Sequence, residues 1–182
     1  MVDSHEASEA LADIDDMVRR VRQSRIYDLA SQMMIMWGVL VFVGYIITYL
    51  MPSHAFVGWT LVYAIGIAGW AALSSINRPR SGVRAFDLKF FIAFALFLAF
   101  GIFCCVLGQF GPRQISTFWP VYFLMMYSIA GLWFGYAFIA IGLTVSALTL
   151  IGYFYLGSAF DLWMAFNNGG GLVLGGLWMR RV

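Results

Sequence analysis

The 44 residues from Thr117 to Phe160 include no charged side chain. A single α-helix of that length would be roughly 66 Å long, about twice the thickness of the hydrocarbon core of a bilayer. The stretch must therefore fold back on itself as two membrane-length helices. We expect the turn at Gly131 to Gly135. Pro120 then falls in the first turn of the first of these helices, where proline is best tolerated.

The composition of the whole chain is that of a membrane protein. Of its 182 residues, 62% are apolar and 11% are charged, and the mean hydropathy is +0.83. Soluble domains are about 45–50% apolar and about 25% charged. The apolar runs predict an all-α bundle of six transmembrane helices, which leaves no room for a soluble catalytic domain. We expect the spans at 29–51, 55–75, 90–109, 117–132, 137–156 and 158–179.

The basic residues predict the orientation of this bundle. Ten of the eleven Lys and Arg residues lie in three clusters, within 19–25, 78–89 and 180–181, and Arg113 stands apart. Six spans put all three clusters on one side, and basic residues favour the cytoplasmic side. We therefore expect a multi-pass protein of a plasma membrane, such as a bacterial inner membrane, with both ends in the cytoplasm. Because the clusters flank spans that need a lipid bilayer around them, we expect no nucleic-acid partner.

Residues 1–28 form a region of their own before the transmembrane domain, 29–182. From residue 3 to 28 the pattern predicts an amphipathic helix, acidic in its first half and basic in its second. Its apolar residues form a narrow seam with the spacing of a coiled coil: Ala7, Leu11, Ile14, Val18 and Val21. Two heptads are too short to be stable alone. The seam therefore needs a partner, which could be the protein's own bundle, a second copy or a cytoplasmic protein. No proline precedes Pro52, so this helix and the first span can be continuous.

The last apolar run contains the most unusual residues of the chain. Asn167 and Asn168 are adjacent near its centre, Asp161 lies near its outer end, and Gly171 and Gly175 form a GxxxG pair. One interpretation is that the glycines allow close packing and the amides bridge helices. The alternative is a partly unwound helix whose amides line a polar pocket. Since neighbouring residues on an α-helix point about 100° apart, we expect the two amides to face different neighbours.

Three further patterns concern packing and helix ends. Asp161 is expected to be hydrated or to cap the sixth span, with a proton or cation site as the alternative. The second span has a ridge of small residues suited to close helix contact, formed by Ala64, Ala68 and Ala72. Three hairpins share a weak repeat, in which a glycine precedes each outer turn and a tryptophan opens the returning helix. Its members are Gly44 with Trp59, Gly101 with Trp119, and Gly152 with Trp163.

The sequence contains no recognisable catalytic, cofactor or metal motif. His5 and His54 lie in the tail and in an outer turn, and Cys104 and Cys105 are adjacent within an apolar run. We therefore expect no enzyme, no cofactor and no metal. We expect instead an accessory or regulatory membrane protein that acts through protein contacts, with the N-terminal helix as its docking element. The alternative is a small-solute transporter or channel with a polar site on the sixth span.

Overall fold

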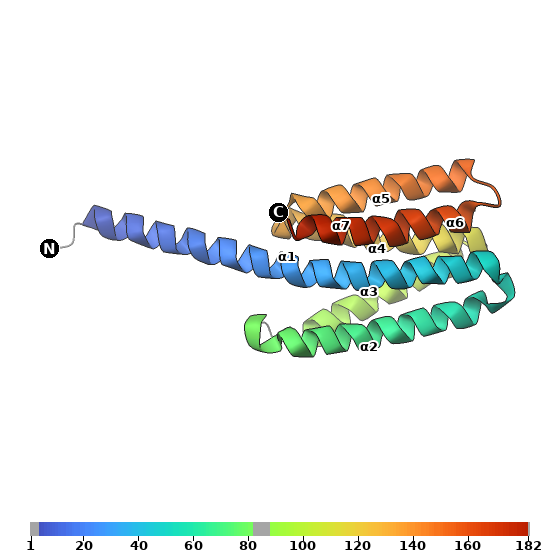
Figure 1. Cartoon of the computed structure of the whole chain (residues 1–182), viewed down its shortest axis with the longest axis horizontal. Helices are drawn as coiled ribbons and strands as arrows, with labels where there is room; N and C mark the ends of the chain where they lie inside the picture. The colour runs from blue at the N-terminus through green and yellow to red at the C-terminus, as the bar shows by residue number, and fades with distance from the viewer. Residues whose placement is uncertain (1–3, 82–87, 182) are drawn as a thin grey trace.

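The structure, a computed structural model, describes residues 4–81 and 88–181, and every regular element in these ranges is a helix (Figure 1). The all-α prediction is confirmed for this part of the chain. Successive long helices run in alternating directions. The elements are α1 (Ser4–Leu50), the 3₁₀ turn η1 (Pro52–His54), α2 (Ala55–Ser81), α3 (Leu88–Leu107), α4 (Pro112–Phe134), α5 (Tyr136–Tyr155), α6 (Phe160–Met164), the π-helical segment η2 (Ala165–Gly170) and α7 (Gly171–Met179).

Four helical segments of the described chain are long and apolar enough to cross a membrane. They are Ile26–Leu50, Pro52–Ile76, Pro112–Phe134 and Tyr136–Tyr155. Two other apolar segments are not single helices of this length. Phe91–Leu107 is a shorter apolar helix, and the last run is divided among α6, η2 and α7. The chain therefore has the make-up of a multi-helix membrane protein.

Helix α1 is a single element of 47 residues, so it measures roughly 70 Å at 1.5 Å per residue. It continues without a break from the N-terminal region into the first apolar run, and its early part projects beyond the rest of the bundle (Figure 1). Residues 1–3 of the N-terminal region and residues 82–87, within the second basic cluster, lie outside the described residues.

Helix α4 begins at Pro112, five residues before the expected start of its span. Gly111 precedes it, and the Gln114 side chain accepts a hydrogen bond from the N–H of Gly111 at 2.7 Å, which stabilises the first turn. Pro120 therefore lies inside the helix, and the prediction that it lies in the first turn was wrong. The helix ends at Gly135, whose φ of 131° is accessible mainly to glycine. This residue makes the turn into α5.

The internal proline explains a contact between α1 and α4. Pro120 has no N–H, so the carbonyl of Ser116, four residues earlier, loses its usual partner within the helix. The hydroxyl of Tyr45, on α1, donates a hydrogen bond to this carbonyl at 2.8 Å. Tyr45 is only 2% exposed. A buried side chain thus satisfies the backbone group that the proline leaves free, as packing in a bilayer requires.

In the structure, each glycine of the three hairpins packs against the tryptophan with which the sequence pairs it. In each hairpin the tryptophan ring covers the Cα of its glycine, so that a side chain added to the glycine would meet the ring. A Cβ on Gly44 would lie 3.2 Å from Trp59, and one on Gly101 would lie 2.9 Å from Trp119. The same position on Gly152 is closer still to Trp163. The three hairpins α1–α2, α3–α4 and α5–α6 therefore share one way of closing at their turns.

The buried residues lie mainly among α1, α4, α5 and α7. One apolar cluster joins these four helices around Met34, Leu124 and Ile141, and a second, around Tyr45, Phe160 and Met164, lies nearer the turns. Helix α2 packs on α1, where Gly66 approaches Trp37 and Gly69 approaches Met36. The side chains of α3 are mostly exposed from Phe91 to Phe100. The core thus lies on the side of the bundle that holds the last apolar run.

Candidate functional site

The last apolar run widens at its centre instead of breaking. Residues Ala165–Gly170 form a π-helical segment, in which the N–H of Gly171 reaches back to the carbonyl of Phe166, five residues earlier. At its two ends the backbone keeps right-handed helical angles, with φ −61° and ψ −37° at Met164 and φ −63° and ψ −42° at Gly170. Its backbone groups are therefore used within the helix. Such π-helical segments often occur at functional sites, so the side chains here are the first candidates.

The two adjacent amides converge on one residue of the neighbouring helix. The Nδ2 atoms of Asn167 and Asn168 donate hydrogen bonds to the Thr149 hydroxyl on α5, at 2.9 and 3.1 Å. Asn167 also donates to the carbonyl of Val145 at 3.1 Å. The expectation that the amides face different neighbours was wrong, because it assumed α-helical geometry. A π-helical turn holds more residues than an α-helical turn, so the angle between adjacent side chains is smaller.

This polar cluster of Thr149, Asn167 and Asn168 is closed. The three residues are 0%, 8% and 2% exposed. The Thr149 hydroxyl donates to the carbonyl of Val145 at 2.8 Å, so its single donor and its two acceptor sites are all used. Asn168 makes a second contact, from Nδ2 to the Met164 sulfur at 3.4 Å. The cluster therefore joins the sixth apolar run to α5 and leaves few donors for a bound solute.

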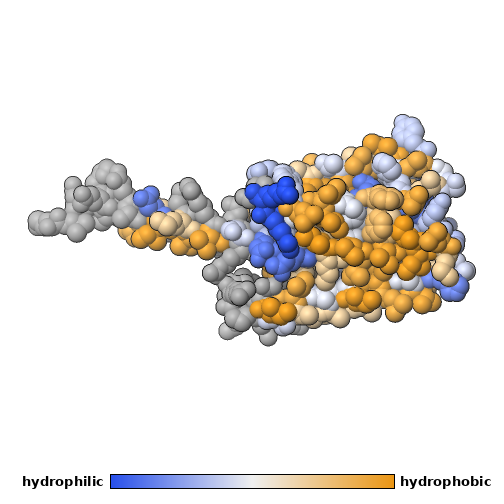
Figure 2. Space-filling view, viewed as in Figure 1, coloured by the Kyte–Doolittle hydropathy of each residue, from blue (hydrophilic) through white to orange (hydrophobic). Residues whose placement is uncertain are grey.

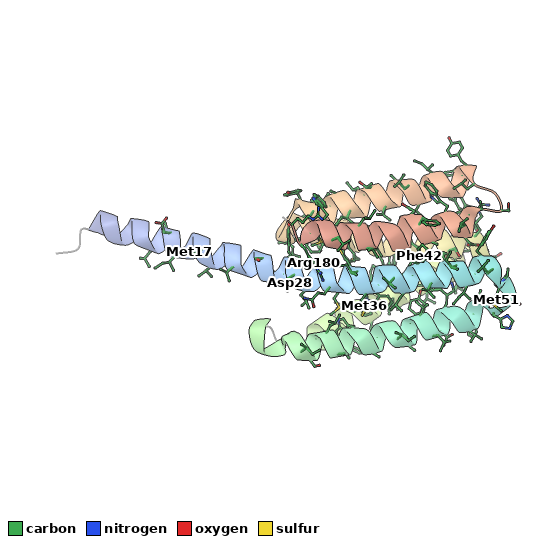
Figure 3. All side chains as sticks on the ribbon, viewed as in Figure 1. Met17, Asp28, Met36, Phe42, Met51 and Arg180 are labelled. Atoms are coloured by element: carbon green, nitrogen blue, oxygen red, sulfur yellow. The ribbon has the colours of Figure 1, made fainter. Side chains whose placement is uncertain are left out.

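Glycines bring the same run close to both of its neighbours. A Cβ on Gly171 or Gly175 would lie about 3 Å from Val145 or Ile141, respectively, so the GxxxG pair faces α5. Gly169 and Gly176 face α1, where a Cβ on Gly169 would lie 2.6 Å from the Cα of Phe42. The segment from η2 through α7 is thus wedged between α1 and α5. Figure 3 labels Phe42 on the side of α1 that faces this segment.

Asp161 lies apart from the amides, near the turns. It is half-buried in the first turn of α6, where the N-cap position belongs to Ala159. The expectation that Asp161 caps the helix was therefore wrong, although a carboxylate in the first turn still suits the helix dipole. Its charge interacts with that of Arg113 from the start of α4. Asp161 thus lies at the same end of the bundle as Arg113, whose guanidinium lies over the ring of the preceding residue, Phe160.

Arg113 closes the end of α5. Its guanidinium donates hydrogen bonds to the carbonyls of Tyr153 at 2.8 Å, Gly157 at 3.3 Å and Leu156. It also lies over the ring of Phe160, 4.6 Å from the ring centroid. The last carbonyls of a helix lack partners within the helix and attract positive charge. Arg113 thus joins the start of α4 to the end of α5.

The other predicted residues remain exposed. Leu11, Ile14, Val18 and Val21 of the seam are 64%, 55%, 60% and 53% exposed. Met17, labelled in Figure 3, is 65% exposed on the same projecting part of α1. The ridge of Ala64, Ala68 and Ala72 lies on an exposed face of α2, since the close contact of α2 with α1 uses its glycines instead. The structure brings the seam and the polar cluster to different parts of the molecule.

Thr149 and Tyr45 are the residues that sequence reasoning missed. Thr149 lies in an apolar span, where a threonine commonly bonds to its own helix backbone, and nothing near it in the sequence marks it. Tyr45 had a usable signal. Pro120 inside a helix frees a carbonyl, and a bilayer requires a partner for it. Because the helix was predicted to start at residue 117 rather than at Pro112, Pro120 was not expected to leave a carbonyl without a partner.

No family model, curated protein or solved structure matches this chain. The fold and the site therefore define its class on their own. It is an all-helical protein with several membrane-length apolar helices, a closed polar cluster inside the bundle and an exposed apolar seam on a projecting helix.

Proposed function

We propose that the chain crosses a membrane six times, with both ends in the cytoplasm of a cell whose plasma membrane resembles a bacterial inner membrane. Three observations support this orientation. The long helices alternate in direction. Ten of the eleven basic residues of the sequence lie in the three clusters that six spans would put on one side, and Arg113 lies among the turns at the other end of the bundle. Cationic residues favour the cytoplasmic side.

Labelling of single cysteines tests this topology. In a background with Cys104 and Cys105 replaced by alanine, Ser4→Cys and Ser81→Cys should react with a membrane-impermeant maleimide only after the cells are opened. His54→Cys, in the turn η1, should react in intact cells. Labelling of Ser4→Cys or Ser81→Cys from outside intact cells would contradict the proposed orientation.

The proposed function is that of an accessory or regulatory membrane protein that acts through protein contacts and carries out no catalysis. The observation that carries this proposal is the seam of Leu11, Ile14, Val18 and Val21. These side chains are more than half exposed on a helix that is continuous with a membrane-length segment. Removing apolar surface from water is favourable by about 25 cal/mol for each Å². A partner that covers these side chains would therefore gain binding free energy.

Solute transport is the second candidate, because a π-helical segment with two buried amides occurs at the centre of the sixth run. The hydrogen bonds of the cluster argue against it. The Thr149 hydroxyl is fully used, and the amide nitrogens already have partners. A solute that accepts hydrogen bonds would have to replace these bonds. We therefore favour a structural role for the cluster and a functional role for the seam.

The Ile14→Asp variant tests the docking role. A buried, unpaired carboxylate costs roughly 3 kcal/mol or more, so association through the seam should weaken at least a hundredfold. The matched control is Ala12→Asp, on the opposite face of the same helix and also exposed. Both variants should insert in the membrane as folded proteins. Equal particle mass and equal partner retention in Ile14→Asp and the parent would contradict the docking role.

A further inference from the structure

The seam continues along α1 into the membrane. The exposed residues Leu11, Ile14, Val18 and Val21 are followed on the same helix by Asp28, Val39, Val43 and Leu50. With Gln32, which is half-exposed, these positions follow one another in steps of three, four or seven residues. Such steps are whole turns of an α-helix, so the residues lie on one face. We call this set of nine residues the α1 stripe.

Inside the bundle, the stripe is the face of α1 that its neighbours leave uncovered. Helix α2 packs against Met36 and Trp37. The segment of η2 and α7 packs against Gly38 and Phe42, on another side. Between these two sides, Val39 and Val43 are 51% and 44% exposed, and Leu50 is 68% exposed. In Figure 2 apolar residues cover the side of the bundle and one edge of the projecting helix.

The two halves of the stripe need different kinds of cover. Lipid can cover Val39 to Leu50. It cannot cover Leu11, which lies roughly 22 Å of helix before Ile26, where the membrane-length segment starts. A soluble protein could cover the first half but not the second. An occupant of the whole stripe must itself be a helix that passes from water into the membrane at the same depth.

We propose that the occupant is a second copy of this chain, with the two α1 helices parallel and paired along the stripe. This inference rests on the proposed function and names the partner of its docking seam. A second copy in the same membrane presents the same stripe in the same direction, and twofold symmetry is the commonest arrangement of identical subunits. The stripe repeats close to every seven residues, which suits the left-handed supercoil of two parallel helices.

The charges at the flanks of the seam are compatible with this pairing. The sequence puts Ala10 and Met17 at one flank of the seam, and Asp15 and Arg22 at the other. In a parallel pair these two flanks meet, so no like charges face one another at the flanks, whereas Asp28 on the stripe and, by its seven-residue spacing from Val18 and Gln32, Arg25 each face the same residue of the second copy and oppose the pairing. Gln32 donates to Asp28 at 3.2 Å within one chain, where α1 enters the bundle. In the pair, Gln32 faces its symmetry mate and can hydrogen-bond across the interface.

Single cysteines on the stripe test the pairing in membranes. Ile14→Cys and Val39→Cys, each without Cys104 and Cys105, lie at core positions of the pair, where two symmetry mates are close enough to form a disulfide. The controls are Ala12→Cys, on the other face of α1, and Leu143→Cys, 60% exposed on α5. Upon mild oxidation, both stripe variants should form severalfold more crosslinked dimer than both controls.

Other results would overturn the inference in distinguishable ways. Crosslinking of Ile14→Cys alone would mean that the seam pairs without the membrane half of the stripe. If neither stripe variant crosslinks above its control, but a different protein stays bound to the parent and is lost from Ile14→Asp, the second copy is wrong and the docking function stands. If neither crosslinking nor an Ile14-dependent partner is found, both proposals are wrong.

Discussion

The polar cluster around Thr149 and the α1 stripe differ in whether their side chains find partners within the chain. The cluster has the residues that usually suggest function in a membrane, yet it is closed, and its amide nitrogens and hydroxyl are hydrogen-bonded. The stripe is mostly aliphatic, the composition of ordinary packing, yet it has no cover within the described chain. Buried polar groups tend to find partners inside one chain, whereas an uncovered apolar face calls for a partner from outside. The proposed docking role therefore rests on exposure rather than on residue type.

The largest expected effect concerns the close packing beside the cluster. Gly169→Ala would put a Cβ 2.6 Å from the Cα of Phe42, and backbone atoms cannot move away cheaply. It should destabilise the bundle by roughly 2–3 kcal/mol. The adjacent Gly170→Ala is the control, since nothing lies within 4 Å of its added Cβ, and it should stabilise the helix by up to about 1 kcal/mol. Thermal unfolding in detergent measures both. Equal losses would mean that the run does not wedge against α1.

A smaller effect is expected when the acceptor of both amides is removed. Thr149→Val keeps the shape of the side chain but leaves Asn168 without an oxygen partner among its described bonds. The variant should lose about 1 kcal/mol of stability. In that background Asn168→Leu should cost less than in the parent, where we expect about 0.6 kcal/mol. Additive losses would show that the hydroxyl and the amide act separately.

The assembly of these variants sharpens the comparison further. If the cluster is structural, Thr149→Val and Asn168→Leu should keep the particle mass of the parent while their unfolding temperatures shift. Ile14→Asp should instead change the particle mass. Loss of a measured solute uptake into liposomes in a folded Asn168→Leu variant would instead make the cluster the functional site.

A last effect, of similar size, separates two buried tyrosines of α1. Tyr45→Phe removes the partner of the Ser116 carbonyl and should cost about 1 kcal/mol. Tyr27→Phe removes a hydroxyl that is buried without a partner in the described structure, so it should be neutral or slightly stabilising. In a Pro120→Ala background, Tyr45→Phe should cost less, because residue 120 then supplies the missing N–H. An unchanged cost in that background would contradict the link between Pro120 and Tyr45.

Much of the fold follows from sequence patterns, whereas little of the site does. The charge-free stretch from Thr117 to Phe160 required a turn, and Gly135 supplies it. The absence of proline before Pro52 allowed one long helix, and α1 is continuous. The glycine–tryptophan pairs were visible as a weak repeat, but only the folded chain shows each ring over its glycine. These features are local along the chain or set by its composition.

The residues around the amides could not be predicted because the π-helical segment changes their directions. Helical periodicity assigns Asn167 and Asn168 to different neighbours, and only the wider turn brings both to Thr149. Only the first half of the α1 stripe could be predicted. Sequence spacing identified the seam from Leu11 to Val21, but the position of α2 and α7 around α1 decides which face of the span stays open. That choice depends on packing between distant segments.

The most direct test of the central claim is the mass of the full-length protein in lipid nanodiscs at high lipid excess, measured by native mass spectrometry. The α1 stripe predicts particles with two copies of the chain for the parent and for Ala12→Asp, and mainly one copy for Ile14→Asp. Parent particles that hold one copy, with no other protein attached, would contradict both the stripe and the docking function.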